Sequence, residues 1–125
     1  MRDIKFRGLT FDREWLYGDL VSQTCNAYSK IVDVGIKEFQ MHVVEVRKNT
    51  VGQFTGLTDK NDKDIYENDI IKFNIKLVSM KFVGKVIFDD SSWCGIVKNM
   101  KETLPFGALN DFEIIGNIHD NPELL

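Results

Sequence analysis

The sequence predicts a mainly β fold, a barrel-like antiparallel sheet with very little helix. Apolar and polar residues alternate along several stretches, as in "IKFRG" at 4–8 and "IIKFNIK" at 70–76. A period of two is typical of a strand with one face buried and the other in water. These runs are rich in Phe, Ile and Val, which favour strands. The stretch "MKETLPFGAL" allows at most a turn or two of helix, because Pro105 and Gly107 interrupt it.

Turn residues divide the alternating runs into separate strands. "FDRE" at 11–14 separates the first two, and only "LVS" at 77–79 separates the halves of a long hairpin over 69–89. At the end of the chain, Asn121 is expected to cap a single turn that begins at Pro122. The predicted strands are 4–12, 15–23, 29–36, 40–47, 51–57, 69–77, 80–89, 93–98 and 112–118.

Length and strand order suggest how the fold is organised. A chain of 125 residues corresponds to one ordinary domain, here 1–125. The run from "YENDIIKF" through "SSWCGIVKN" resembles the strand order of a small SH3-like barrel. We therefore expect an N-terminal β layer over 1–50 and an SH3-like half over 51–125. A fold of this kind does not dictate function.

The composition excludes several classes of protein. No apolar run approaches the roughly 20 residues needed to span a bilayer, and the N-terminus lacks the apolar region of a signal peptide. We therefore expect a cytoplasmic protein with no membrane partner. Cys25 and Cys94 are far apart, so reduced thiols are expected rather than a zinc site. His42 and His119 are equally isolated, and no metal, cofactor or catalytic residues are predicted.

The parity of the alternating strands predicts the core. Seven residues hold the apolar positions of their strands and are expected to be mostly buried: Phe6, Trp15, Ile71, Phe73, Val86, Phe88 and Ile114.

The stretch "TGLTDKNDKDIYENDIIKF" at 55–73 contains five carboxylates and suggests two kinds of site. An EF-hand loop that began at Asp59 would place Lys63 and Ile70 at ligand positions, where neither residue can bind calcium. A catalytic pair would need a burial-perturbed pKa, whereas these acids alternate with lysines in a polar segment. The stretch is therefore interpreted as two turns, 59–62 and 67–69, around an apolar anchor.

Four lysines form the one concentrated charge in the sequence. The net charge is −3, but residues 70–88 carry +4 and no acid, so the remaining residues carry −7. If the hairpin pairs as predicted, the four lysines lie on one sheet face, where they could contact phosphates or an acidic partner. The aromatic residues of the hairpin have the opposite parity and point to the core. The tentative binding surface is Lys72, Lys76, Lys81 and Lys85, and a merely solvated face is the alternative.

Three blocks carry a family resemblance over essentially the whole chain. They are "IKFRGLTFDREWLYGDLV" at 4–21, "VGQFTGLTDKNDKDIYENDII" at 51–71 and "EIIGNIHDNPELL" at 113–125. Together they resemble the YopX family, small proteins of bacteriophages and prophages of Gram-positive bacteria. The resemblance implies a phage or prophage origin and a mainly β fold, and it brings no catalytic residues. The family usually has Gly where this chain has Asp62 and Asn68, so a positive φ is expected there.

These observations lead to a functional hypothesis with two alternatives. The leading hypothesis is a non-enzymatic phage accessory protein of the bacterial cytoplasm that binds another macromolecule. The partner is expected to be a protein rather than nucleic acid, and a homo-oligomer is possible. The first alternative is a nucleic-acid-binding module that uses the four lysines. The second is a small enzyme with an unrecognised site.

Overall fold

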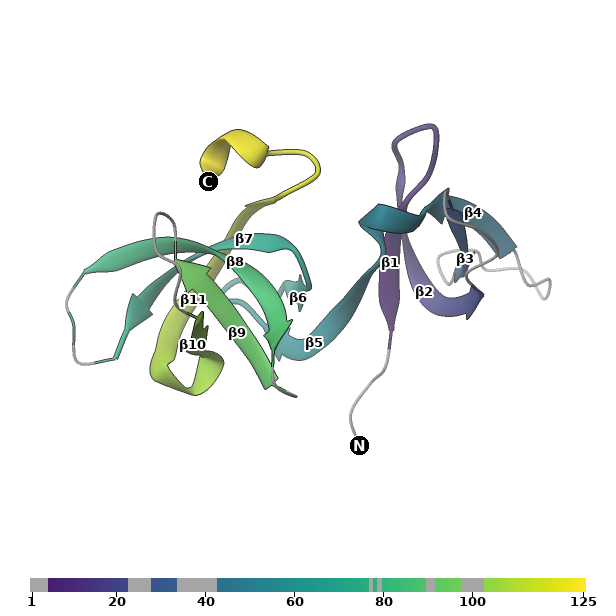
Figure 1. Ribbon diagram of the computed structural model, residues 1–125. Coiled ribbons are helices and arrows are strands. Elements are labelled where there is room, and N and C mark those ends of the chain that lie inside the picture. The colour runs from purple at the N-terminus through teal and green to yellow at the C-terminus, as the bar shows by residue number, and fades with distance from the viewer. Residues whose placement is uncertain are drawn as a thin grey trace. The chain divides into compact units, whose positions relative to one another are not determined.

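A computed structural model describes the greater part of the chain in two compact units (Figure 1). The N-terminal unit comprises residues 1–54 and the C-terminal unit residues 55–125. The expected subdivision placed this boundary after residue 50. The described residues are 5–22, 28–33, 43–76, 78, 80–89, 92–97 and 103–125.

The N-terminal unit is an antiparallel sheet with the strand order β4-β3-β2-β1-β5. Its register pairs Leu9 with Trp15 around the first turn and Arg7 with Gly52 at the start of the last strand. A 3-10 helix, η1, leads from β4 into β5, which ends in the C-terminal unit. The elements are β1 (Phe6–Leu9), β2 (Trp15–Ser22), β3 (Tyr28–Asp33), β4 (Val43–Arg47), η1 (Lys48–Thr50) and β5 (Gly52–Thr58).

The C-terminal unit contains a five-stranded antiparallel sheet with the order β10-β9-β8-β7-β11. The short strand β6 lies beside β5. Two further 3-10 helices connect β10 to β11 and follow β11. The elements are β6 (Asp64–Tyr66), β7 (Asp69–Ile75), β8 (Lys81–Asp89), β9 (Ser92–Val97), β10 (Thr103–Pro105), η2 (Phe106–Ala108), β11 (Leu109–Asn117) and η3 (Pro122–Leu124).

The prediction of a mainly β fold with very little helix is confirmed, but the sheets are open. Each helical element is a 3-10 helix of three residues. No closed barrel is found among the described residues. The edge strand β10 has three residues and ends at Pro105, which lacks the N–H that a further ladder would need.

Some boundaries and one cap differ from the sequence prediction. The predicted strands omitted β6 and β10, because three residues are too few to show alternation. Asn121 precedes η3 as expected, but its side chain makes no cap hydrogen bond to η3. Its Oδ1 accepts the Asn117 N–H instead, at 3.3 Å. This fold-back requires glycine at 116, where a Cβ would lie 2.5 Å from that Oδ1.

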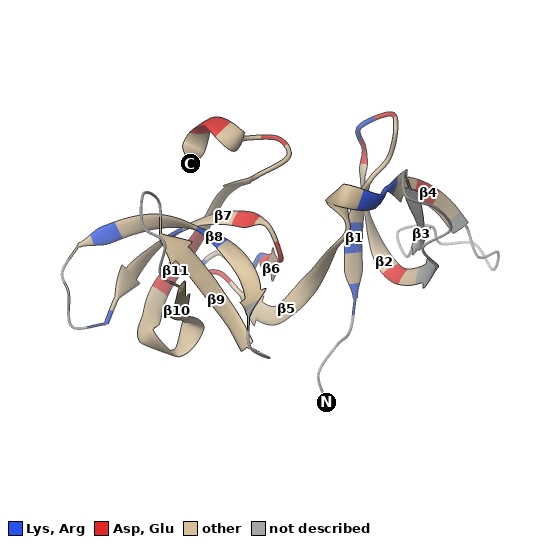
Figure 2. Cartoon of the chain, in the orientation of Figure 1, with Lys and Arg blue, Asp and Glu red and all other residues tan. Residues whose placement is uncertain are grey.

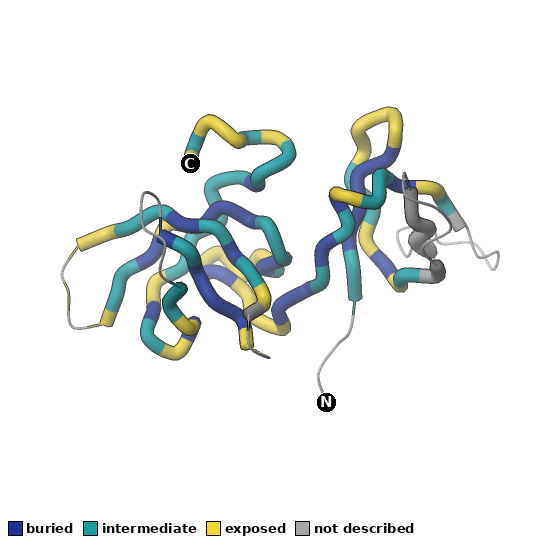
Figure 3. Tube along the Cα trace, in the orientation of Figure 1, coloured by how far each residue is buried: buried dark blue, intermediate teal, exposed yellow. Residues whose placement is uncertain are grey.

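Figure 3 marks the buried residues of the C-terminal unit in dark blue, and the strand register places the core residues of β7, β8 and β9 on one face of the sheet. Close packing leaves no room at Gly84, where a Cβ would lie 2.6 Å from the Ile96 carbonyl oxygen and 3.1 Å from the Phe73 ring. The buried cluster consists of Ile65, Ile71, Phe73, Val86, Trp93, Val97, Phe106 and Leu109.

The predicted core residues are largely correct, with one error. Ile71, Phe73 and Val86 are completely buried. Phe88 is 51% exposed, so its predicted burial is wrong. It has the core parity, but it lies near the end of β8, where its ring packs against the ring of Trp93, at 4.9 Å between centroids. The remaining three are half-buried: Phe6, Trp15 and Ile114.

Candidate functional site

The acidic stretch at 55–73 is a backbone scaffold, and Asp59 holds its first turn. The Asp62 N–H donates to the Asp59 carbonyl oxygen at 3.0 Å, which closes the predicted turn. Asp59 Oδ1 accepts the N–H groups of Asn61 at 2.8 Å and Lys63 at 3.0 Å. Its Oδ2 accepts the Ile114 N–H at 3.0 Å. One side chain therefore ties the turn to β11.

The same contacts determine the protonation of Asp59. Burial raises the pKa of this carboxyl, but the N–H donors of Ile114, Lys63 and Asn61, together with the charge of Lys63, outweigh it. The net result is a pKa below the ordinary value. Asp59 is thus a fixed hydrogen-bond acceptor that stays ionised at neutral pH. An ionised carboxylate has no proton to donate to a substrate.

The second turn is built in a similar way. Asp69 is 1% exposed, and its Oδ2 accepts the Tyr66 N–H at 2.8 Å. The Asn68 N–H donates to the Val86 carbonyl oxygen at 2.9 Å. Ile65 and Tyr66 are both buried and form the apolar anchor between the turns. The interpretation of the stretch as two turns around an anchor is confirmed.

The two positions where the family usually has Gly adopt the left-handed conformation. The φ angles are 62° at Asp62 and 72° at Asn68, as predicted. Asp and Asn tolerate this region better than other residues with a side chain. The backbone of both turns is therefore kept without glycine.

The lysine face, defined as Lys72, Lys76, Lys81 and Lys85, is largely brought together by the β7–β8 ladder. In this ladder Lys85 lies opposite residue 70 and Lys81 lies opposite residue 74. Lys72 is two residues from each of these positions, and side chains two residues apart point to the same face. The three lysines therefore share one face of the sheet. Lys76 follows the last residue of β7, so the ladder does not fix its direction. All but the half-buried Lys85 are exposed.

The neighbouring strand β11 carries acidic residues, which are coloured red in Figure 2. Glu113 lies opposite Lys72 in the β7–β11 ladder, and it pairs with Lys60 at 3.5 Å. Lys81 Nζ lies 2.7 Å from Asp111 Oδ2, and this hydrogen bond lowers the pKa of Asp111. The face therefore carries both signs of charge. The sequence of the hairpin contained no sign of this, because β11 is about 30 residues away along the chain.

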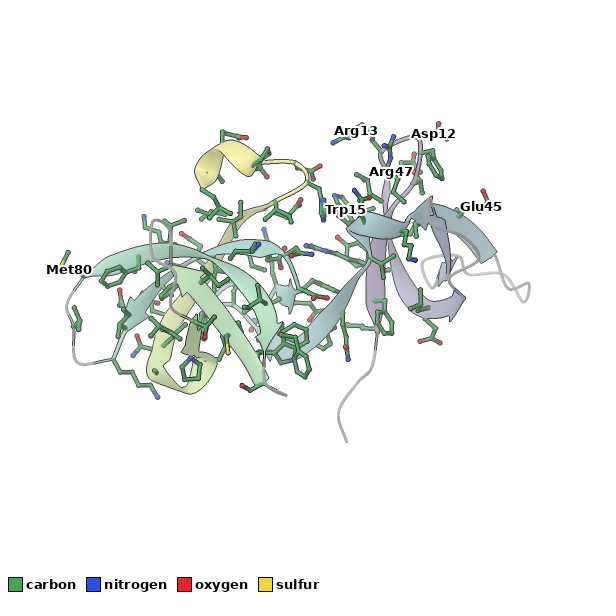
Figure 4. The ribbon with its side chains drawn as sticks, viewed as in Figure 1. Asp12, Arg13, Trp15, Glu45, Arg47 and Met80 are labelled. Atoms are coloured by element: carbon green, nitrogen blue, oxygen red, sulfur yellow. The ribbon has the colours of Figure 1, made fainter. Side chains whose placement is uncertain are left out.

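An acidic cleft in the N-terminal unit was missed by the sequence reasoning. It has a volume of about 550 Å³ and lies between the β1–β2 turn and β4. Figure 4 shows Asp12 on that turn and Glu45 on β4. The lining residues are Thr10, Phe11, Asp12, Glu14, Leu16, Val44 and Glu45.

The turn beside the acidic cleft is tightly held. Thr10 N–H donates to the Glu14 carbonyl oxygen at 2.9 Å, and the Glu14 N–H donates to Thr10 Oγ1 at 3.0 Å. Arg13 closes the turn with a φ of 64°. Arg47 of β4 places its guanidinium 5.3 Å from the centre of the Phe11 ring and donates from Nη2 to the Phe11 carbonyl oxygen at 3.5 Å.

The isolated cysteines and histidines are partly outside the described residues. Cys25 and His42 lie there, whereas Cys94 is a buried free thiol. The backbone N–H of the half-buried His119 donates to Asn117 Oδ1 at 3.0 Å. Within the described ranges, no three His, Cys, Asp or Glu residues are arranged to hold a metal ion. None of the helices in that part of the chain has the length and apolarity to cross a membrane.

Comparisons with known proteins give a family and a fold. The family model described as "YopX protein" matches residues 5–125. The crystal structure of protein EF1440 from Enterococcus faecalis matches with a TM-score of 0.57 and 20% identity, over 100% of this chain and 99% of that one. An identity this low shows a shared fold only. No curated protein matches the chain.

Proposed function

The chain belongs to the YopX family, and we propose that it is a non-enzymatic phage accessory protein that binds another protein through its lysine face. The phage context comes from the family resemblance of the three sequence blocks. A cytoplasmic site of action in the host cell is part of the same proposal.

The observation that carries this proposal is the placement of three lysines on one face of the β7–β8 ladder. Lys72, Lys81 and Lys85 lie together by register, and Lys72 and Lys81 are exposed. Ammonium groups on one face of a sheet match an acidic patch on a partner, and long-range attraction speeds such encounters.

The acids on this face favour a protein partner over nucleic acid. A phosphate backbone that approached Lys72 and Lys81 would also meet Glu113 and Asp111. A protein surface with both charges can complement such a face, whereas a polyanion cannot. Phe73 lies on the opposite side of the sheet and is completely buried, so it offers no stacking platform beside these lysines. Nucleic-acid binding is therefore the alternative function.

The contacts of the acidic stretch support a non-enzymatic function. Its two buried carboxylates, Asp59 and Asp69, accept backbone N–H groups. A general acid or base needs an atom directed at substrate and a pKa near the working pH. The lowered pKa of Asp59 moves it away from that range.

An SH3-like arrangement of the C-terminal unit is part of the proposal. Five antiparallel strands in the order β10-β9-β8-β7-β11, with η2 between β10 and β11, support it. In this arrangement the lysine face would be an outer face of the sheet, opposite the core.

The experiment compares capture by two charge-matched variants. The test variant is Lys72→Gln/Lys85→Gln, and the control is Lys48→Gln/Lys63→Gln, which removes the same charge elsewhere. Each is used for pull-downs from infected host cells, read by mass spectrometry at two salt concentrations. We expect the test variant to lose a salt-sensitive protein partner that the control retains. Equal capture by both variants contradicts the proposal, and a salt-sensitive DNA or RNA shift lost only in the test variant supports the alternative.

A further inference from the structure

The acidic cleft combines three carboxylates with an apolar wall. Asp12, Glu14 and Glu45 are all exposed. Among the described residues, the lining contains no lysine, arginine or histidine. The rest of the lining includes Phe11, which is 51% exposed, and the half-buried Leu16. The cleft has a volume of about 550 Å³ and is open to solvent.

The two walls of the cleft are joined before any ligand binds. Arg47 of β4 contacts the ring and the carbonyl oxygen of Phe11, and Thr10 fixes the turn through its hydroxyl and its N–H. Thr10 itself is 8% exposed, so this support lies below the surface. A site whose walls are already fixed loses less conformational freedom on binding.

The lining residues suit a basic side chain better than a metal ion. A metal ion needs oxygen ligands that converge on one point. Asp12, Glu14 and Glu45 do not form a metal-holding group among the described residues. Separated carboxylates beside apolar surface instead match a lysine or arginine side chain. Its aliphatic stem covers apolar groups while its charged end meets the carboxylates.

We infer that the acidic cleft is a docking site for a lysine- or arginine-containing peptide segment of a partner protein. Leu16 and Val44 contact the stem of the basic side chain, and Asp12, Glu14 and Glu45 hold its cationic group. This site goes beyond the proposed function, because its described lining residues belong to the N-terminal unit and are distinct from the lysine face.

The test uses a labelled peptide and isosteric variants of the full chain. The probe is a fluorescein-labelled hexapeptide with three lysines, and the same peptide with acetylated lysines is the comparison. Binding is followed by fluorescence anisotropy at low and high salt. The test variant is Asp12→Asn/Glu45→Gln. The matched control, Asp62→Asn/Glu123→Gln, changes the net charge equally through exposed residues of the other unit.

The expected result distinguishes peptide binding at the cleft from attraction to the net charge of the whole chain. The lysine peptide should bind the unchanged chain and weaken at high salt, and acetylation should weaken it about tenfold or more. The test variant should show a similar loss and the control less than about a twofold change. Circular dichroism should show that both variants stay folded, since the replaced side chains are exposed.

Several outcomes overturn the inference. They are no binding of the lysine peptide, equal binding of the acetylated peptide, or an equal loss in the control variant. A fourth is salt-sensitive self-association in sedimentation velocity that the test variant abolishes, because the occupant would then be a second copy of this chain. The lysine-face variants play no part in this test, so its failure leaves the proposed function standing.

Discussion

Among the described residues, ring–ring contacts occur in the C-terminal unit and cation–ring contacts in the N-terminal unit. In the C-terminal unit, rings pack on rings: Phe106 lies 5.0 Å from Phe112 and Phe88 lies 4.9 Å from Trp93. In the described part of the N-terminal unit, Lys5 lies over a ring, with its Nζ 4.4 Å from the centre of the Phe54 ring. Ring packing excludes water, whereas a cation–π pair tolerates a polar setting.

The completely buried side chains follow the same division. Among the described residues, those with the least exposed area belong mainly to the C-terminal unit, including Ile65, Ile70 and Phe73. Leu9 and Val46 are the N-terminal examples. From the residues whose burial is described, we expect the C-terminal unit to carry the larger share of the stability. The acidic cleft lies in the N-terminal unit.

The largest expected effect is a core truncation in the C-terminal unit. Phe73→Ala should lower the free energy of unfolding by about 3–5 kcal/mol, because the ring is completely buried. The matched change Phe11→Ala in the N-terminal unit should cost about 1 kcal/mol or less, since that ring is half-exposed and loses mainly its contact with Arg47. Urea unfolding followed by circular dichroism measures both. An equal loss in the free energy of unfolding for the two variants would contradict the expected difference between the units.

An intermediate effect is expected at Asp59. The Asp59→Asn variant keeps the shape, but an amide nitrogen cannot accept the Ile114 N–H if Oδ1 keeps its two donors. We expect a loss of about 1–3 kcal/mol at pH 7, measured by urea unfolding.

The pH dependence of Asp59 sharpens this prediction. Its folded pKa lies below the ordinary 3.8, so the stability that it supplies is full above the unfolded pKa. That stability is lost as the pH falls through the folded pKa. The Asn variant should therefore lose less stability than the unchanged chain between about pH 5 and pH 2. An equal loss of stability in the Asn variant and the unchanged chain over this pH range would contradict the claim that ionised Asp59 stabilises the fold.

The smallest effect is expected at the left-handed position of the first turn. Asp62→Gly should change stability by less than about 0.5 kcal/mol, because relief of the positive φ of 62° offsets the greater freedom of unfolded glycine. Lys60→Gly is the control in the same turn, where no positive φ occurs. It should cost about 0.5–1 kcal/mol. Thermal unfolding measures the stability of both variants. A larger loss for Asp62→Gly than for Lys60→Gly would show that Asp62 is not strained.

Much of the fold could be predicted from local patterns, because strand alternation and turn chemistry are local. The parity that assigned Phe73 and Val86 to the core is correct, and so is the positive φ at Asp62. Phe88 has the same parity, but no local pattern shows how far a neighbouring strand covers it. The strand β10 was too short to detect.

The candidate sites could be predicted less well, because both depend on contacts distant in sequence. Lys72 was placed correctly on a sheet face, but its acidic neighbour Glu113 comes from a strand far along the chain. The acidic cleft joins Asp12 of the first turn to Glu45 of β4, which have no shared motif. The strand register pairs Lys72 with Glu113, whereas the cleft joins the β1–β2 turn to β4, which are not neighbours in the sheet.

Native-state hydrogen exchange of the whole chain tests the division between the units most directly. The account predicts that amides of β7 and β8, which lie inside the five-stranded sheet, exchange only when the C-terminal unit unfolds. Amides of β1 and β2 should exchange at least about tenfold faster, through opening of the N-terminal unit alone. Equal protection of the two pairs of strands, or slower exchange in β1 and β2, would contradict it.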